Sequence, residues 1–75
     1  MSRALTPKEW LVISLVADGM KNAEIASEIG STEHMVKNYL RSIYDKLGFW
    51  NRTEVAMWYV RRTFGNEHKE RFDPK

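Results

Sequence analysis

The stretch that decides the fold is NAEIASEIGSTEHMVKNYLRSIYDKLG, residues 22–48. It indicates two helices joined by a tight turn, because apolar residues recur at helical spacing on both sides of a glycine. Ala26 leaves room where two crossed helices approach each other, and Gly30 permits the turn. The positions that together have the spacing of a helix-turn-helix are Ile25, Ala26, Ile29, Gly30, Val36 and Tyr39.

The second helix of this pair is amphipathic. Its apolar stripe consists of Val36, Leu40, Ile43 and Leu47. The opposite side carries His34, Asn38, Arg41 and Asp45, with Lys37 on its flank. A helix held rigidly by its apolar side can project such a polar side into the major groove of DNA, which is wide enough to admit one helix.

Outward from this pair, the sequence predicts four helices in all, near residues 7–18, 23–29, 33–47 and 52–63. Each is followed by one of the four glycines, Gly19, Gly30, Gly48 and Gly65. The expected N-terminal caps are Thr6 in a capping box with Glu9, then Asn22, Ser31 or Thr32, and Asn51. We therefore predict an all-α domain over residues 1–65, followed by a polar tail over 66–75 that frays.

Composition excludes several classes of function. The chain has 75 residues and no cysteine, which excludes disulfide scaffolds, thiol catalysis and cysteine-based zinc sites. It has two histidines, too few for a histidine-rich metal site. It has no apolar run of membrane-spanning length and no signal-peptide stretch, so we expect a cytoplasmic protein without membrane association. No carboxylate pair, nucleophile–base pair or phosphate loop stands out, so we expect no enzyme, no catalytic residue, no metal and no cofactor.

Charge is distributed unevenly along the chain. Residues 1–33 carry three basic and five acidic residues, residues 34–62 carry six basic and two acidic residues, and residues 63–75 balance. The net charge of +4 on the middle segment is typical of a surface that faces a polyanion.

The chain also resembles the LuxR/GerE-type helix-turn-helix domain of bacterial transcription regulators. The resemblance is carried by Leu5-Thr6-Pro7-Lys8-Glu9, Val12-Ile13, Leu15-Val16-Ala17-Asp18-Gly19, Asn22-Ala23-Glu24-Ile25-Ala26, Val36-Lys37, Lys46-Leu47-Gly48 and Asn51-Arg52-Thr53-Glu54. It implies a four-helix domain that binds double-stranded DNA, works at the nucleoid and pairs with a second copy through its last helix. Family members usually carry the domain after a receiver or ligand-sensing domain, and some consist of it alone; the sequence leaves this choice open.

The sequence departs from the family pattern at several positions. Met35 stands where the family usually has threonine, and Tyr39 where it usually has histidine. Trp50 lies in a loop that is usually polar, and Trp10 replaces a commonly polar residue. These changes concern the contacts with DNA more than the scaffold.

The candidate DNA contacts divide into two groups. The base-reading candidates are Lys37, Asn38 and Arg41, with His34 at the helix start facing a base or a phosphate. The phosphate-contact candidates are Lys21, Asn22, Thr32, Lys46, Arg52 and Thr53. For Arg52 an ion pair with Glu9 is an equally good interpretation.

The fourth helix has more apolar residues than one face can hold. We expect Ala56, Tyr59, Val60 and Thr63 to face the core, and we assign the homodimer contact to Val55, Trp58 and Arg62. Alternatively, Trp58 folds back onto Trp10. A second function class also remains, a protein-interaction adaptor that would use Trp10, Trp50, Met57 and Trp58.

Overall fold

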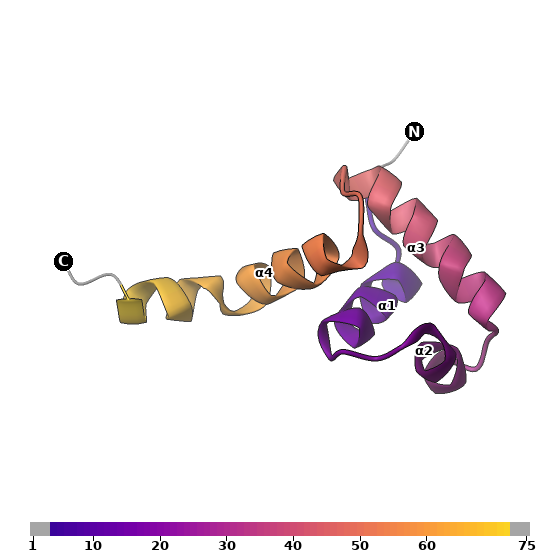
Figure 1. Cartoon of the computed structure of the whole chain (residues 1–75). Coiled ribbons are helices and arrows are strands. Elements are labelled where there is room, and N and C mark those ends of the chain that lie inside the picture. The colour runs from indigo at the N-terminus through magenta and orange to yellow at the C-terminus, as the bar shows by residue number, and fades with distance from the viewer. Residues whose placement is uncertain (1–3, 73–75) are drawn as a thin grey trace.

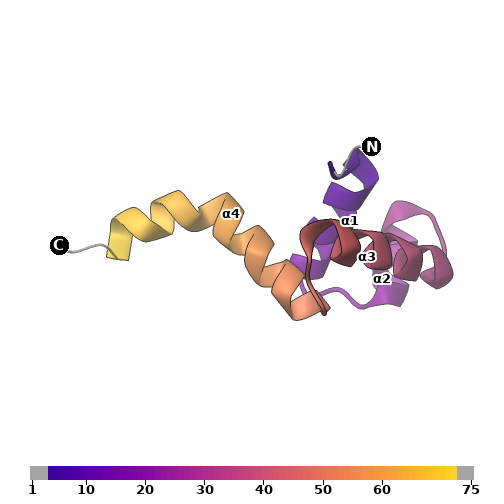
Figure 2. The ribbon, with the colours of Figure 1, turned by 90° about the horizontal axis from the view of Figure 1, so that it is seen from above.

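A computed structural model describes the backbone of residues 4–72 and the side chains of residues 4–64. It contains α1 (Pro7–Ala17), α2 (Asn22–Ile29), α3 (Glu33–Leu47) and α4 (Arg52–Phe72), as Figure 1 shows. No strand occurs among the described residues, which confirms the predicted all-α fold. Seen from above, in Figure 2, α4 leaves the group formed by α1, α2 and α3 on one side.

Three of the four predicted N-terminal caps are present. Thr6 and Glu9 form the capping box, because each side chain accepts a hydrogen bond from the backbone N–H of the other, at 3.1 and 2.9 Å. The hydroxyl of Thr32 accepts from the N–H of Met35 at 3.1 Å, and the amide oxygen of Asn51 accepts from the N–H of Glu54 at 3.0 Å.

The cap predicted at Asn22 is wrong. The residue that precedes α2 is Lys21, and Asn22 is already the first residue of the helix. The Glu24 carboxylate accepts a hydrogen bond from the Lys21 backbone N–H at 2.8 Å. A residue of the first turn therefore supplies a partner for a backbone donor at the start of α2. The Asn22 side chain is then available for a contact with α4, described below.

Glycine ends α2 and α3 but not α4. Gly30 and Gly48 adopt left-handed φ angles of 69° and 74°, the conformation that closes a last helical turn. α4 runs through Gly65 to Phe72, so the predicted end at residue 63 is wrong. A glycine inside a helix costs only about 1 kcal/mol relative to alanine, and the glutamate, lysine and arginine residues that follow are good helix formers.

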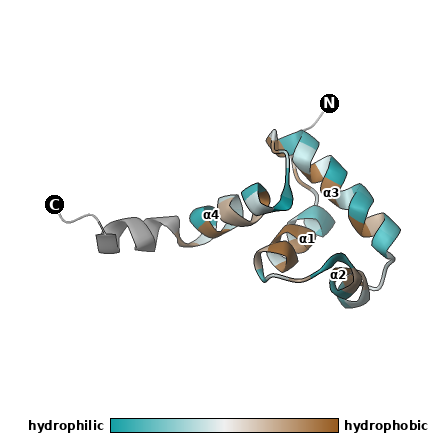
Figure 3. Ribbon diagram, in the orientation of Figure 1, coloured by the Kyte–Doolittle hydropathy of each residue, from teal (hydrophilic) through white to brown (hydrophobic). Residues whose placement is uncertain are grey.

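The core lies where α1 meets the other three helices. α4 packs mainly against α1, α2 packs against α3, and α1 also touches α2 and α3. Figure 3 shows apolar residues concentrated on α1, between the other helices. The buried apolar side chains are Val12, Ile13, Leu15, Val16, Ile25, Ala26, Val36, Leu40, Ile43 and Val55.

The predicted core face of α4 is partly wrong. Val55 is fully buried, whereas Val60 is 45% exposed and Thr63 is exposed. Trp58 explains the difference, because its ring stacks on that of Trp10 with 5.5 Å between centroids. This contact rotates α4 so that the side bearing Val55 and Trp58 faces α1.

Candidate nucleic-acid interface

The outer face of α3 presents the base-reading candidates together. Lys37, Arg41 and His34 are exposed, and Asn38 is half-buried with its amide nitrogen 3.9 Å from the Met35 sulfur. The residues on the opposite side of the helix, Val36, Leu40 and Ile43, are at most 4% exposed. The predicted amphipathic arrangement is confirmed, and it leaves one continuous polar face on α3.

α2 holds α3 at a fixed angle by a small apolar contact. Ile25 and Val36 are fully buried and Ala26 is 5% exposed, as the helix-turn-helix pattern predicts. The turn between them is closed by a hydrogen bond from the Ser31 N–H to the Ala26 carbonyl at 2.8 Å. The N-terminal half of α3 therefore projects from a rigid support.

A polar cluster centred on Glu9 holds the C-terminal half of α3 against α1. Glu9 is 4% exposed. The Lys46 ammonium lies 2.8 Å from one carboxylate oxygen of Glu9 and donates to the Ala4 carbonyl at 3.1 Å. The Ser42 hydroxyl donates to the other carboxylate oxygen at 2.7 Å. Lys46, a candidate phosphate contact, thus has its charge engaged inside the domain.

The pKa of Glu9 reflects this setting. Burial alone would raise it, but the hydrogen bonds from Lys46, Ser42 and the Thr6 backbone outweigh burial and lower the pKa below the ordinary value of 4.5. Glu9 is therefore ionised at neutral pH, and it completes an ion pair that joins two helices.

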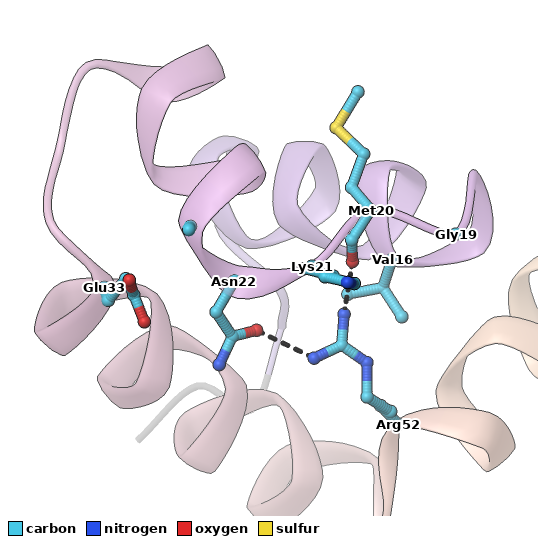
Figure 4. Close-up of a pocket in the computed structure, with 8 residues that line it drawn as sticks. Val16, Gly19, Met20, Lys21, Asn22, Glu33 and Arg52 are labelled. Atoms are coloured by element: carbon cyan, nitrogen blue, oxygen red, sulfur yellow. Dashed lines mark hydrogen bonds between the residues drawn. The ribbon is translucent and has the colours of Figure 1, made fainter.

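Arg52 connects the start of α4 to the start of α2. Its guanidinium donates to the Asn22 amide oxygen at 2.7 Å and to the Met20 carbonyl at 2.6 Å, and both contacts can be followed in Figure 4. The alternative pairing of Arg52 with Glu9 is wrong, since Lys46 holds that carboxylate. The structure thus brings the two phosphate-contact candidates Asn22 and Arg52 together, but their polar groups bind each other.

The remaining phosphate candidates lie at the ends of helices. Lys21, Thr32 and Thr53 are all exposed. Lys21 immediately precedes α2, Thr32 caps α3, and Thr53 is in the first turn of α4. These three side chains border the helix N-termini, where backbone N–H groups favour an anion.

Of the three residues assigned to a dimer contact, only Arg62 is exposed. Val55 is fully buried, so its assignment to the interface is wrong. Trp58 is half-buried against Trp10, as the alternative interpretation proposed, and Phe49 packs edge-on to it at 6.5 Å. The Arg62 guanidinium carbon lies 5.5 Å from the Trp10 ring and 5.4 Å from the Trp58 ring, within the range of a cation–π interaction.

A different apolar stripe on α4 is exposed. Met57, Val60 and Phe64 are 54%, 45% and 57% exposed, and their spacing of three and four places them on one side of the helix. The sequence contains this spacing, but it contains several overlapping apolar stripes on the same helix. The burial of Val55 and the packing of Trp58 on Trp10 decide which stripe faces outward.

Comparison with known proteins gives the relationship. The profile of a family described as bacterial regulatory proteins, luxR family, matches residues 3–59. The chain belongs to this family. The chain is 48% identical over 52 residues to the transcriptional regulatory protein YdfI of Bacillus subtilis. It is 38% identical over 53 residues to the HTH-type transcriptional regulator MalT of Vibrio campbellii, and 38% identical over 52 residues to MalT of Yersinia pestis.

These similarities concern one domain of the luxR-family relatives. The matches cover 69–71% of this chain but 24% of YdfI and 6% of each MalT. Within that domain, the match establishes a DNA-binding helix-turn-helix of a transcription regulator. In the part of the chain that the structure describes, no helix is long and apolar enough to cross a membrane.

Proposed function

We propose that this luxR-family domain reads double-stranded DNA by placing α3 in the major groove. Lys37 and Arg41 would meet guanine edges and Asn38 an adenine edge, because each of these side chains suits that pattern of donors and acceptors. His34 would touch a base or a phosphate at the start of the helix. The observation that carries the proposal is the continuous polar face of α3, held from behind by α2 and by the Glu9 cluster.

Phosphate contacts would come chiefly from Lys21, Thr32 and Thr53, which border helix N-termini and are exposed. Lys46 and Arg52 would act indirectly, because each already makes two hydrogen bonds within the domain, to Glu9 and Ala4 and to Asn22 and Met20. They would fix the helices whose other residues touch DNA. The Asn22 oxygen likewise serves Arg52, so only its amide nitrogen remains to face a phosphate.

We further propose a weak homodimer through the exposed stripe of Met57, Val60 and Phe64. These side chains offer apolar surface on the helix where related domains pair, but the area is small, so the dimer would be completed on DNA. A two-fold dimer requires an inverted-repeat site, with half-sites about one helical turn apart.

The protein would act at the nucleoid in the cytoplasm, under a signal from a receiver or ligand-sensing domain on the same or another chain.

The adaptor alternative loses support from the packing of the tryptophans. Trp10 and Trp58 stack on each other, so two of the four residues that an adaptor would use are engaged within the domain. An adaptor also has no need of Lys37, Asn38 and Arg41 grouped on α3.

The experiment that tests the proposal is selection of bound fragments from random duplex DNA, followed by titration of the selected duplex at several salt concentrations. The logarithm of the affinity should fall linearly with the logarithm of salt, with a slope of about −3 to −6 per protomer. A flat salt response would exclude binding to the phosphate backbone.

A further inference from the structure

Trp50 is the large apolar side chain that the fold leaves most exposed among the described residues. It lies in the turn between α3 and α4 and is 86% exposed. Its neighbours in the chain have structural roles: Phe49 packs against Trp58, and Asn51 caps α4. The Trp50 backbone is held too, since its N–H donates to the Glu54 carboxylate at 2.6 Å. The turn thus presents an indole on a fixed backbone.

A shallow groove joins Trp50 to the polar face of α3. Its lining consists of Asn38, Arg41, Ser42, Tyr44, Asp45, Gly48, Phe49 and Trp50. Two of these residues, Asn38 and Arg41, are proposed base readers. The groove therefore runs from the middle of the reading face along the C-terminal half of α3 and ends at the indole.

We propose that Trp50 is a further DNA-contact residue, whose indole packs against the deoxyribose and base edges of the nucleotides that flank those read by Arg41. The inference rests on the proposed function, because it needs α3 in the major groove. Duplex DNA is favoured as the occupant by the continuity of the groove with that face, on which Lys37 and Arg41 are exposed and Arg41 lines the groove. The sugar and the thymine methyl group supply the apolar surface that an indole can cover.

The test measures affinity for a duplex that carries a single half-site, so that dimerisation does not contribute. Trp50→Ala should weaken binding about tenfold, which corresponds to the loss of one large buried apolar side chain, and Trp50→Phe should retain most of the affinity. The slope of the salt dependence should stay unchanged, because no charge is removed. Leu11→Ala, an exposed apolar residue on α1 that takes part in none of the proposed contacts, should leave half-site binding within about twofold of wild type.

A second readout observes the indole directly. Acrylamide should quench mainly Trp50, since Trp10 and Trp58 are half-buried, and added half-site DNA should protect this fluorescence in the wild type but not in Trp50→Phe. If Trp50→Ala binds the half-site as tightly as wild type and DNA leaves the indole quenchable, the inference is overturned. If the wild type itself shows no preference for any duplex, the proposed function fails first.

Discussion

Lys46 and Arg52 illustrate how a basic residue near a DNA-reading helix can belong to the scaffold. Both match the family pattern, and charge alone suggests a phosphate contact for each. In the structure Lys46 pairs with the buried Glu9 carboxylate, and Arg52 binds Asn22 and the Met20 carbonyl. The sequence offered Arg52 as a partner for Glu9 and did not indicate Lys46, because both cations lie far from Glu9 along the chain.

The Glu9 cluster makes stability depend on pH. The folded-state pKa of Glu9 lies below its unfolded value, so its contribution is fully present above about pH 4.5 and is lost as pH falls through the lower folded value. We expect the urea midpoint of the wild type to fall between pH 6 and pH 3. Glu9→Gln should be less stable at pH 6, by about 2 kcal/mol, because the variant lacks the charge that Lys46 needs.

The difference in stability between the wild type and Glu9→Gln reports the effect of this one carboxylate separately from the other acidic groups. It should shrink as the pH is lowered, since protonation removes the same charge in the wild type. A difference that stays constant from pH 6 to pH 3 would show that Glu9 does not act through its ionised form.

At the scale of the helices, strong local signals were sufficient for the first three. The Thr6–Glu9 capping box, the cap at Thr32 and the glycines at positions 30 and 48 mark helix ends through interactions between near neighbours. α4 was harder for two reasons. Its rotation depends on a contact between Trp58 and Trp10, and its length depends on whether Gly65 must turn the chain, which the local sequence does not specify.

The corrected rotation of α4 predicts opposite behaviour for two of its apolar residues. Val55→Ala should destabilise the domain by about 2–3 kcal/mol, since it removes two buried methyl groups and leaves a cavity. Met57→Ala should leave the melting temperature nearly unchanged but reduce cooperative binding to a paired inverted-repeat site. Thermal unfolding and binding to paired and single half-sites measure these effects. If Met57→Ala and Phe64→Ala both keep the wild-type cooperativity, this result contradicts the proposed dimer face.

At the scale of the whole molecule, α1 contacts the other three helices, and this allows so short a chain to hold α3, the proposed reading helix, in place. α4 packs on one part of α1, while α3 is joined to it by apolar contacts and by the Glu9–Lys46 ion pair. The proposed DNA-reading face of α3 therefore contributes little to the core, and its side chains can change without unfolding the domain. The grouping of these side chains was predictable from helical periodicity. For Trp50 the sequence indicates a departure from the family pattern and an adaptor contact, whereas its exposure and its groove depend on how α3 and α4 pack.

The most direct test of the central claim compares the affinity of Arg41→Ala for the selected duplex with its affinity for a scrambled duplex of equal length. The variant should lose about 1–3 kcal/mol of binding to the selected duplex, with little change for the scrambled one and an unchanged melting temperature. Lys8→Ala, an exposed basic residue on α1, is the matched control and should keep the wild-type preference within about 0.5 kcal/mol. An Arg41→Ala variant that retains the full preference, or a wild type that has none, would contradict the assignment of α3 as the DNA-reading helix.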